Sequence, residues 1–188
     1  MDTPFSFLDA GLATLERALV ERGNDMRNVQ LASLAADGGP ELRTLVLRGF
    51  TREPAEAELH SDARAGKVEE IARDGRVALL AWSAEARLQL RFSGTARLHR
   101  NDPVARARWD SLSEGGRRPY GFRARPGTPI ADPRDQPHLA EEQRFERFAV
   151  ILVALDTVDA LRLGEHGEQW RAAGRFGTAE LGARWVGA

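Results

Sequence analysis

The sequence predicts a mainly β protein, an antiparallel barrel of roughly seven or eight short strands with helices at its ends. Short runs rich in β-branched and aliphatic residues recur along most of the chain, and turn residues separate them at hairpin spacing. Strands joined by hairpins favour an antiparallel sheet. At 188 residues the chain has the size of one domain with its own core, so residues 1–188 are expected to form a single domain.

The N-terminal segment is predicted to be a helix over residues 4–22. Thr3 is a typical cap, Pro4 suits the first helical position, and leucines recur at helical spacing until Gly23. The elements predicted to follow are strands over 29–35, 42–50 and 57–60, a helix over 63–73, and strands over 76–82 and 87–99.

The predicted strand over 87–99 has the clearest alternation in the chain. Its core face carries Leu88, Leu90, Phe92, Ala96 and Leu98, with Gly94 interrupting the apolar row. The opposite face is polar. It is expected either to be solvated, which the spacing alone favours, or to line a ligand site at a subunit contact.

The second half of the chain is predicted to hold helices over 103–112 and 139–148, a strand over 149–155, hairpin strands over 160–163 and 169–172, and a closing segment over 184–186. Residues 91–125 contain nine arginines against three acidic residues. This excess is interpreted as a basic rim for a phosphorylated ligand, as a nucleic-acid patch, or as a solvated face. Few aromatic residues accompany it, which disfavours base stacking.

A predicted anion site lies where the strand over 42–50 meets the helix over 63–73. Ser61 and Asp62 are expected to end a strand and cap that helix, leaving free amides at its start. The cations nearest this point are Arg43, Arg48, Arg64 and Lys67. Together they would hold a phosphate group.

Lys67 is the only lysine among 27 basic residues. Its compact ammonium on a flexible stem is not interchangeable with a planar guanidinium, so it is either a retained phosphate ligand or an accident of codon use. Arg43 and Arg48 are five residues apart, and a regular strand would place them on opposite faces. Both reach one ligand only if a bulge intervenes or if Arg48 lies past the strand end.

Composition excludes several kinds of chemistry. The net charge of −1 gives no general attraction to nucleic acid or anionic membrane, and the absence of cysteine excludes disulfides, thiolate metal sites and a cysteine nucleophile. No dinucleotide, P-loop or serine-elbow motif occurs, and the four scattered histidines predict no metal site. The paired carboxylates Glu69 and Glu70 are interpreted as part of a solvated helix face.

Asp2 and the short apolar run over 148–155 predict a soluble cytoplasmic protein without a membrane span.

Three segments already described resemble the pyridoxamine 5'-phosphate oxidase family, and more closely its shorter oxidase-related members. They are the run from Arg43 to Arg48, the strand end at His60 that leads to Lys67, and the segment over 89–94. The likeness covers roughly residues 26–100. It implies a six- to eight-stranded antiparallel split β-barrel with flanking helices. It also implies a homodimer with FMN in clefts between the subunits.

The resemblance also implies residue roles. Arg43 and Lys67 would hold the FMN phosphate, Gln89 would reach the flavin from the second subunit, and the loop over 125–128 would close the site. The cofactor-binding set carried over is Arg43, Thr44, Leu45, Val46, Arg48, His60, Ser61, Arg64, Lys67, Gln89, Thr128 and Arg175. The substrate-binding set is Arg48 and Arg171, and no catalytic residue is assigned.

Three departures from the family pattern bear on activity. Ala173 stands where family oxidases have a histidine, His60 replaces a tyrosine, and Gly66 replaces an arginine. An FMN-dependent oxidoreductase is the leading hypothesis, with pyridoxine or pyridoxamine 5'-phosphate as substrate and dioxygen as acceptor. The alternatives are a non-catalytic flavin-binding protein, a flavin reductase with another substrate, and a nucleic-acid-binding barrel.

Overall fold

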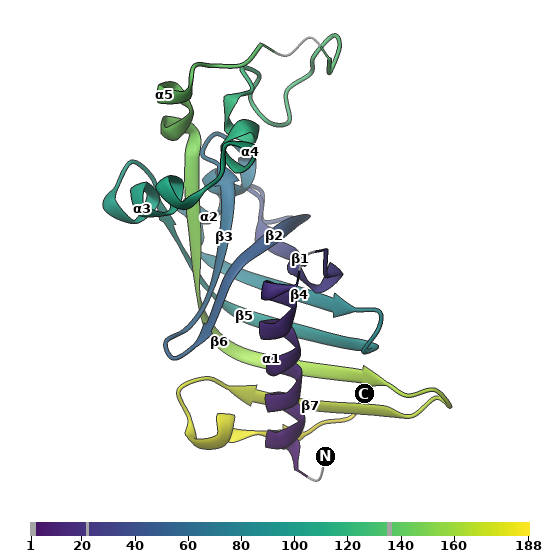
Figure 1. The fold of residues 1–188 in the computed structure, drawn as a ribbon. Helices are drawn as coiled ribbons and strands as arrows, with labels where there is room; N and C mark the ends of the chain where they lie inside the picture. Colours follow the sequence, from purple (N-terminus) through teal and green to yellow (C-terminus); the bar gives the residue numbers. More distant parts are fainter. Residues whose placement is uncertain (1–2, 22, 135–136) are drawn as a thin grey trace.

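Eight strands form one antiparallel sheet that closes on itself. The structure, a computed structural model, describes residues 3–21, 23–134 and 137–188. The sheet order is β3-β2-β1-β4-β5-β6-β7-β8, and an additional β3–β6 pairing closes the first six strands into a barrel. The predicted mainly β split barrel is confirmed (Figure 1). The strands are β1 Asn28–Leu34, β2 Pro40–Arg52, β3 Ala55–Asp62, β4 Arg76–Ser83, β5 Leu88–His99, β6 Phe148–Leu163, β7 Gln169–Arg175 and β8 Arg184–Trp185.

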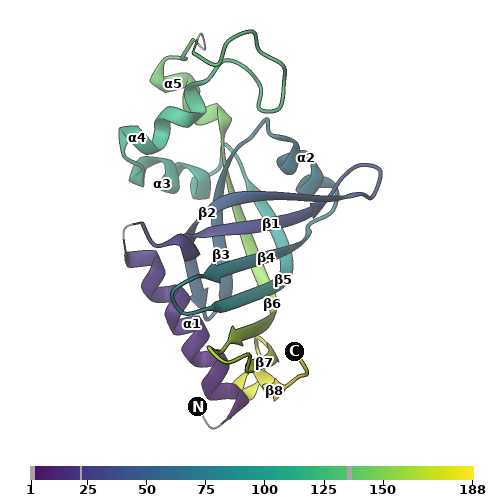
Figure 2. The ribbon, with the colours of Figure 1, turned by 90° about the vertical axis from the view of Figure 1, so that its right-hand side faces the viewer.

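The helices occupy two ends of the molecule. Helix α1 (Pro4–Val20) lies at the end that holds β7 and β8, whereas the other four gather at the opposite end (Figures 1 and 2). These four are α2 Gly66–Arg73, α3 Pro103–Ser111, α4 Glu114–Arg117 and α5 Glu141–Arg144. Within the described ranges, no helix is both long and apolar enough to cross a membrane.

Helix α1 forms where the capping residues predicted it. The Thr3 side chain accepts a hydrogen bond from the backbone N–H of Ser6, and Pro4 occupies the first turn. One face of the helix is buried against the barrel, through Phe7, Leu8, Leu12, Leu15 and Ala18. The helix ends at Val20 rather than at residue 22, and residue 22 lies outside the described residues.

Strand β5 shows the predicted alternation. Leu88, Leu90, Phe92, Gly94 and Ala96 are buried, and the residues that alternate with them are exposed or half-buried. The two strands predicted over 149–155 and 160–163 are instead one strand, β6. Its register against β5 shifts by one residue at Asp156, since Ser93 pairs with Thr157 and Gly94 with Leu155. This bulge lets β6 pair with β3 along its first half and with β7 along its second half.

Two predicted helices are wrong in their bounds. Ser61 and Asp62 do not cap α2, because both pair with β6 as the last residues of β3. The helix begins at Gly66 after Ala65, which makes no side-chain cap. Residues 139–148 are not one helix either, since Phe148 pairs with Asp62 and only the short α5 and a 3-10 turn precede it.

A second, smaller core lies on the other face of β6. Phe148 and Val150 are two residues apart on β6, and both pack against Trp109 of α3 and Tyr120. Ile151 and Val153 pack instead in the main core. Trp109 and Phe148 have ring centroids 5.4 Å apart. This cluster attaches the helical end of the molecule to the barrel.

Gly94 allows the closest approach between β5 and β6. A Cβ at this position would lie 2.1 Å from the carbonyl oxygen of Ala154. Gly94→Ala is therefore expected to lower the free energy of unfolding by at least about 2 kcal/mol. Gly115→Ala is the control, because its Cβ would meet nothing closer than 3.9 Å. Chemical denaturation of both variants checks the prediction, and equal midpoints would contradict it.

Candidate functional site

Arg43 is held by a buried polar pair. Its Nη1 donates to the Ser33 hydroxyl and to the Leu31 carbonyl oxygen, and its Nη2 donates to Glu70 Oε2 at 2.8 Å. The Ser33 hydroxyl in turn donates to the same Glu70 oxygen at 2.6 Å. Ser33 is only 4% exposed and the Glu70 side chain 15%. Arg43 is thus anchored between β1, β2 and α2.

Lys67 shares this corner with Arg43. The Lys67 ammonium lies 3.4 Å from the Ser61 hydroxyl, to which it donates. Burial lowers the pKa of Lys67 below its ordinary value of 10.5, and the positive charge of Arg43 lowers this pKa further, against the opposing charges of Asp62 and Glu70. Two cations that repel each other in a half-buried corner form a site that an anion would stabilise.

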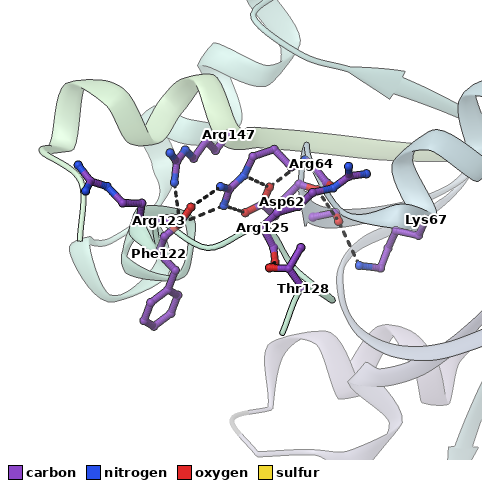
Figure 3. Close-up of polar contacts among 9 residues, drawn as sticks. Asp62, Arg64, Lys67, Phe122, Arg123, Arg125, Thr128 and Arg147 are labelled. Atoms are coloured by element: carbon purple, nitrogen blue, oxygen red, sulfur yellow. Dashed lines mark hydrogen bonds and ion pairs between the residues drawn. The ribbon is translucent and has the colours of Figure 1, made fainter. Parts of the chain in front are cut away.

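Arg64 contacts other neighbours. Its guanidinium bonds Asp62 through Nε and Nη2, and it also donates to the carbonyl oxygens of Phe122 and Arg123, both at 3.0 Å (Figure 3). Arg147 Nη1 donates to the same Phe122 oxygen at 2.6 Å. Arg64 therefore joins the loop that contains Phe122 and Arg123 to the end of β3. Its N–H donors bond to acceptors within the protein.

The loop that carries Thr128 lies beside the start of α2. Arg125 Nε donates to the Arg64 carbonyl oxygen at 2.9 Å, and the Thr128 hydroxyl donates to the Arg125 carbonyl oxygen at 2.7 Å (Figure 3). The Arg125 guanidinium also pairs with Glu69. The loop is thereby held close to Lys67. Thr128 itself is exposed.

The arginine excess over 91–125 is largely paired. Five of its nine arginines form ion pairs, which are Arg91–Asp159, Arg106–Asp110, Arg108–Glu58, Arg117–Glu141 and Arg125–Glu69. Most of these acidic partners lie outside the segment, so local counting along the sequence misses them. The pairing favours an ion-paired surface over a basic patch for nucleic acid.

His60 lies on the other face of β3 from Ser61. Its side chain is 5% exposed, packs edge-on against Phe148 with centroids 4.9 Å apart, and bonds Glu58 at 2.9 Å. Glu58 also pairs with Arg108 of α3. The His60 ring is thus part of the contact between β3 and the second core, whereas the Ser61 hydroxyl faces Lys67.

A bulge, one of the two alternatives considered for Arg48, interrupts β2. The register against β3 shifts between Leu47 and Gly49, which leaves Arg48 as the extra residue. Arg48 is exposed and lies near Tyr120, whose pKa burial raises to about 12 while the Arg48 charge opposes that rise. Arg43 and Arg48 therefore have different neighbours. Between them, Thr44 is exposed, and Leu45 and Val46 are half-buried.

The predicted residues of β5 and β7 are remote from this corner. Gln89 is half-buried opposite Trp82, and Arg175 is exposed at the end of β7. Arg171 is held by Asp159, with Nη2 to Oδ2 at 2.9 Å. Among the described residues, no hydrogen bond or ion pair links Gln89, Arg171 or Arg175 to Arg43 or Lys67.

Sequence reasoning missed Ser33 and Glu70. The interpretation of Glu70 as part of a solvated face is wrong, because its side chain is only 15% exposed and pairs with Arg43, whereas Glu69 is exposed. Its position three residues after Lys67, on the same side of a helix, is the signal that could have found it. Among the described residues, no group of three or more His, Asp or Glu side chains forms a metal site.

The donors at this corner fit a phosphate monoester. Within the described ranges, the Nε–H and one Nη2–H of Arg43 have no protein acceptor, and the Lys67 ammonium has only the Ser61 contact. Charge-assisted N–H donors of this kind are the usual ligands of phosphate oxygens. The apolar side chains of Leu45 and Val46 follow along β2.

Known structures share the whole fold. A pyridoxamine 5'-phosphate oxidase-related, FMN-binding protein from Nostoc punctiforme is 24% identical, with a TM-score of 0.78 over 95% of this chain and 96% of that one. PhzG from Burkholderia lata is 14% identical, with a TM-score of 0.70 over 99% and 93%. General Stress Protein 26 from Bacillus anthracis is 13% identical, with a TM-score of 0.53 over 87% and 98%. At these identities the likeness shows the fold.

A sequence match to a known family covers the segment that carries the site. No protein of curated function matches the chain. Residues 12–100 match the family described as pyridoxamine 5'-phosphate oxidase, FMN-binding domain, and this range contains Ser33, Arg43, Lys67 and Glu70. Over residues 12–100, just under half of its length, the chain is therefore similar to the FMN-binding domain of the pyridoxamine 5'-phosphate oxidase family, and the cofactor that this match indicates is FMN.

Proposed function

We propose that the chain is an FMN-dependent oxidoreductase in which Arg43 and Lys67 bind the FMN phosphate. The observation that carries this proposal is the convergence of these two cations, with unused N–H donors, inside an FMN-binding domain. A phosphate would relieve their repulsion and fill the donors that the protein leaves free.

The proposal includes a homodimer with FMN between the subunits. The outer face of the sheet supports it, because Leu42 of β2 is 67% exposed and Trp82 of β4 is 38% exposed. Leu42, Leu80 and Arg91 help to line a hollow of about 370 Å³. Gln89 lies on this same face. In a dimer, Gln89 and Arg175 of one subunit would complete the site of the other.

The bound flavin supplies the two-electron redox chemistry. The contribution of the chain is binding and orientation. Arg43 and Lys67 fix the phosphate, Leu45 and Val46 offer an apolar edge, and the Arg125–Thr128 loop lies beside the site. Arg64 acts through that loop, which it holds in place.

Pyridoxine or pyridoxamine 5'-phosphate is the leading substrate, with dioxygen as acceptor. A second function, flavin binding without oxidation of the vitamin, is favoured by one observation. Arg171, the predicted substrate arginine, is already held by Asp159, and Ala173, two residues further along the chain, offers no imidazole. A flavin reductase with another substrate is compatible with the same geometry.

A turnover assay separates these functions. Purified protein loaded with FMN is mixed with pyridoxine 5'-phosphate under air, and the absorbance of the aldehyde product is followed. We expect product for the oxidase. If no product forms, oxidation of added NADPH under the same conditions identifies a reductase. A yellow protein that does neither is a flavin-binding protein without turnover.

Loss of the Lys67 charge should weaken the cofactor complex. Lys67→Ala is expected to cost about 1 to 3 kcal/mol in FMN affinity, the loss of a charge-assisted contact. Titration by quenching of flavin fluorescence measures this effect. Arg134→Ala is the matched control, since it removes one positive charge from a side chain that is 87% exposed. Equal affinities for the two variants would show that Lys67 does not hold FMN.

The affinity for FMN should also depend on pH through Lys67. Because the pKa of Lys67 is lowered, its positive charge is lost on raising the pH before an ordinary lysine would lose it at 10.5. FMN affinity should therefore fall in the alkaline range below that value. In Lys67→Arg the guanidinium stays charged there. Parallel titrations against pH should show a fall for the native protein that exceeds any fall for the variant.

A further inference from the structure

Glu70 lies in the cationic corner although its own charge opposes an anion. We propose that Glu70, together with Ser33, is a positioning residue that fixes the Arg43 guanidinium in the orientation that binds the FMN phosphate. The proposal rests on the proposed function, in which Arg43 and Lys67 hold that phosphate. It concerns a residue that would act on the cofactor only through Arg43.

The contacts of Glu70 define the orientation of Arg43. Glu70 Oε2 accepts from Arg43 Nη2 at 2.8 Å and from the Ser33 hydroxyl at 2.6 Å, and Ser33 accepts from Arg43 Nη1. The three groups form a closed ring of hydrogen bonds. Ser33 and Glu70 are shielded from solvent, with 4% and 15% of their surface exposed, so water competes little for these bonds.

The donors that remain on Arg43 form one edge. A guanidinium has five N–H groups, and those directed at Leu31, Ser33 and Glu70 account for three. Since Ser33 and Glu70 occupy the edge shared by Nη1 and Nη2, the free edge is the one formed by Nε and Nη2. Two parallel donors on one edge match two oxygens of a phosphate. Glu70 therefore selects which edge of Arg43 meets the ligand.

The sign of the effect distinguishes positioning from charge. If Glu70 acted only through its charge, its removal would make the corner more positive and strengthen phosphate binding. If Glu70 positions Arg43, its removal frees the guanidinium to turn and weakens binding despite the gain in positive charge. The two interpretations predict opposite changes in the same measurement.

Glu41 provides a matched control. Its carboxylate lies 3.7 Å from Arg43 Nη2, beyond hydrogen-bond distance, and its side chain is 51% exposed. Glu41→Gln therefore removes a negative charge beside Arg43 without breaking the ring of hydrogen bonds. A difference in FMN affinity between Glu41→Gln and Glu70→Gln therefore measures the effect of the hydrogen-bond ring and not that of the lost charge.

The experiment compares FMN with riboflavin, which has the same ring system and no phosphate. Fluorescence titrations are made with the native protein and with Glu70→Gln, Ser33→Ala, Glu41→Gln and Lys67→Ala. Glu70→Gln is expected to weaken FMN binding about tenfold or more and to leave riboflavin binding within about twofold. Ser33→Ala should also weaken FMN binding and leave riboflavin binding within about twofold, and Glu41→Gln should leave both affinities within about twofold.

Several results would overturn the positioning role. One such result is that Glu70→Gln binds FMN as tightly as Glu41→Gln or more tightly. Another is that its affinities for FMN and for riboflavin fall by the same factor, which indicates damage to the fold. If Glu70→Gln does not fold, Ser33→Ala decides by the same FMN-to-riboflavin ratio. Failure of the proposed function has another signature, because FMN affinity would then be unchanged in Lys67→Ala. A loss in Lys67→Ala with none in Glu70→Gln rejects only the positioning role.

Discussion

The pairing of β3 with β6 is the constraint on which the rest of the structure depends. It closes the six-stranded barrel and holds Ser61 and Asp62 in the ladder up to the point where the chain turns into α2. Lys67 and Glu70 project from that helix toward Arg43 on β2, so the phosphate corner is assembled from segments that the barrel closure brings together. Because backbone hydrogen bonds are directional and regular, the paired strands place these side chains in the same positions in every molecule.

Elements with strong local patterns were predictable from the sequence, and those decided by tertiary pairing were not. The apolar alternation of β5 and the capped, leucine-rich α1 needed no knowledge of the fold. Ser61 and Asp62 have the composition of helix caps, yet the ladder with β6 outweighed that preference. The bulge at Asp156 joins two predicted strands into one, and no local turn signal marks it.

The same division holds for the site. The single lysine and the run from Arg43 to Arg48 indicated the corner where Arg43 and Lys67 meet. The types of these residues and their places along the chain were enough for that prediction. Glu70 was misinterpreted because its partner Arg43 is 27 residues away. His60 and Arg64 form contacts with the second core and the long loop, and those contacts depend on how β3 packs, which residue type alone does not specify.

The excursion between β5 and β6 leaves the barrel and returns to it at adjacent positions. His99 and Val150 are partners in the ladder, although 50 residues separate them along the chain. The order of the strands therefore does not depend on the residues inserted between them, which include most of the arginine-rich segment 91–125 and Trp109 and Tyr120 of the second core. Such an insert can lengthen, shorten or change composition during evolution without rebuilding the scaffold. Because the insert borders the start of α2, a change in its sequence can alter the surroundings of that helix end while the barrel stays the same.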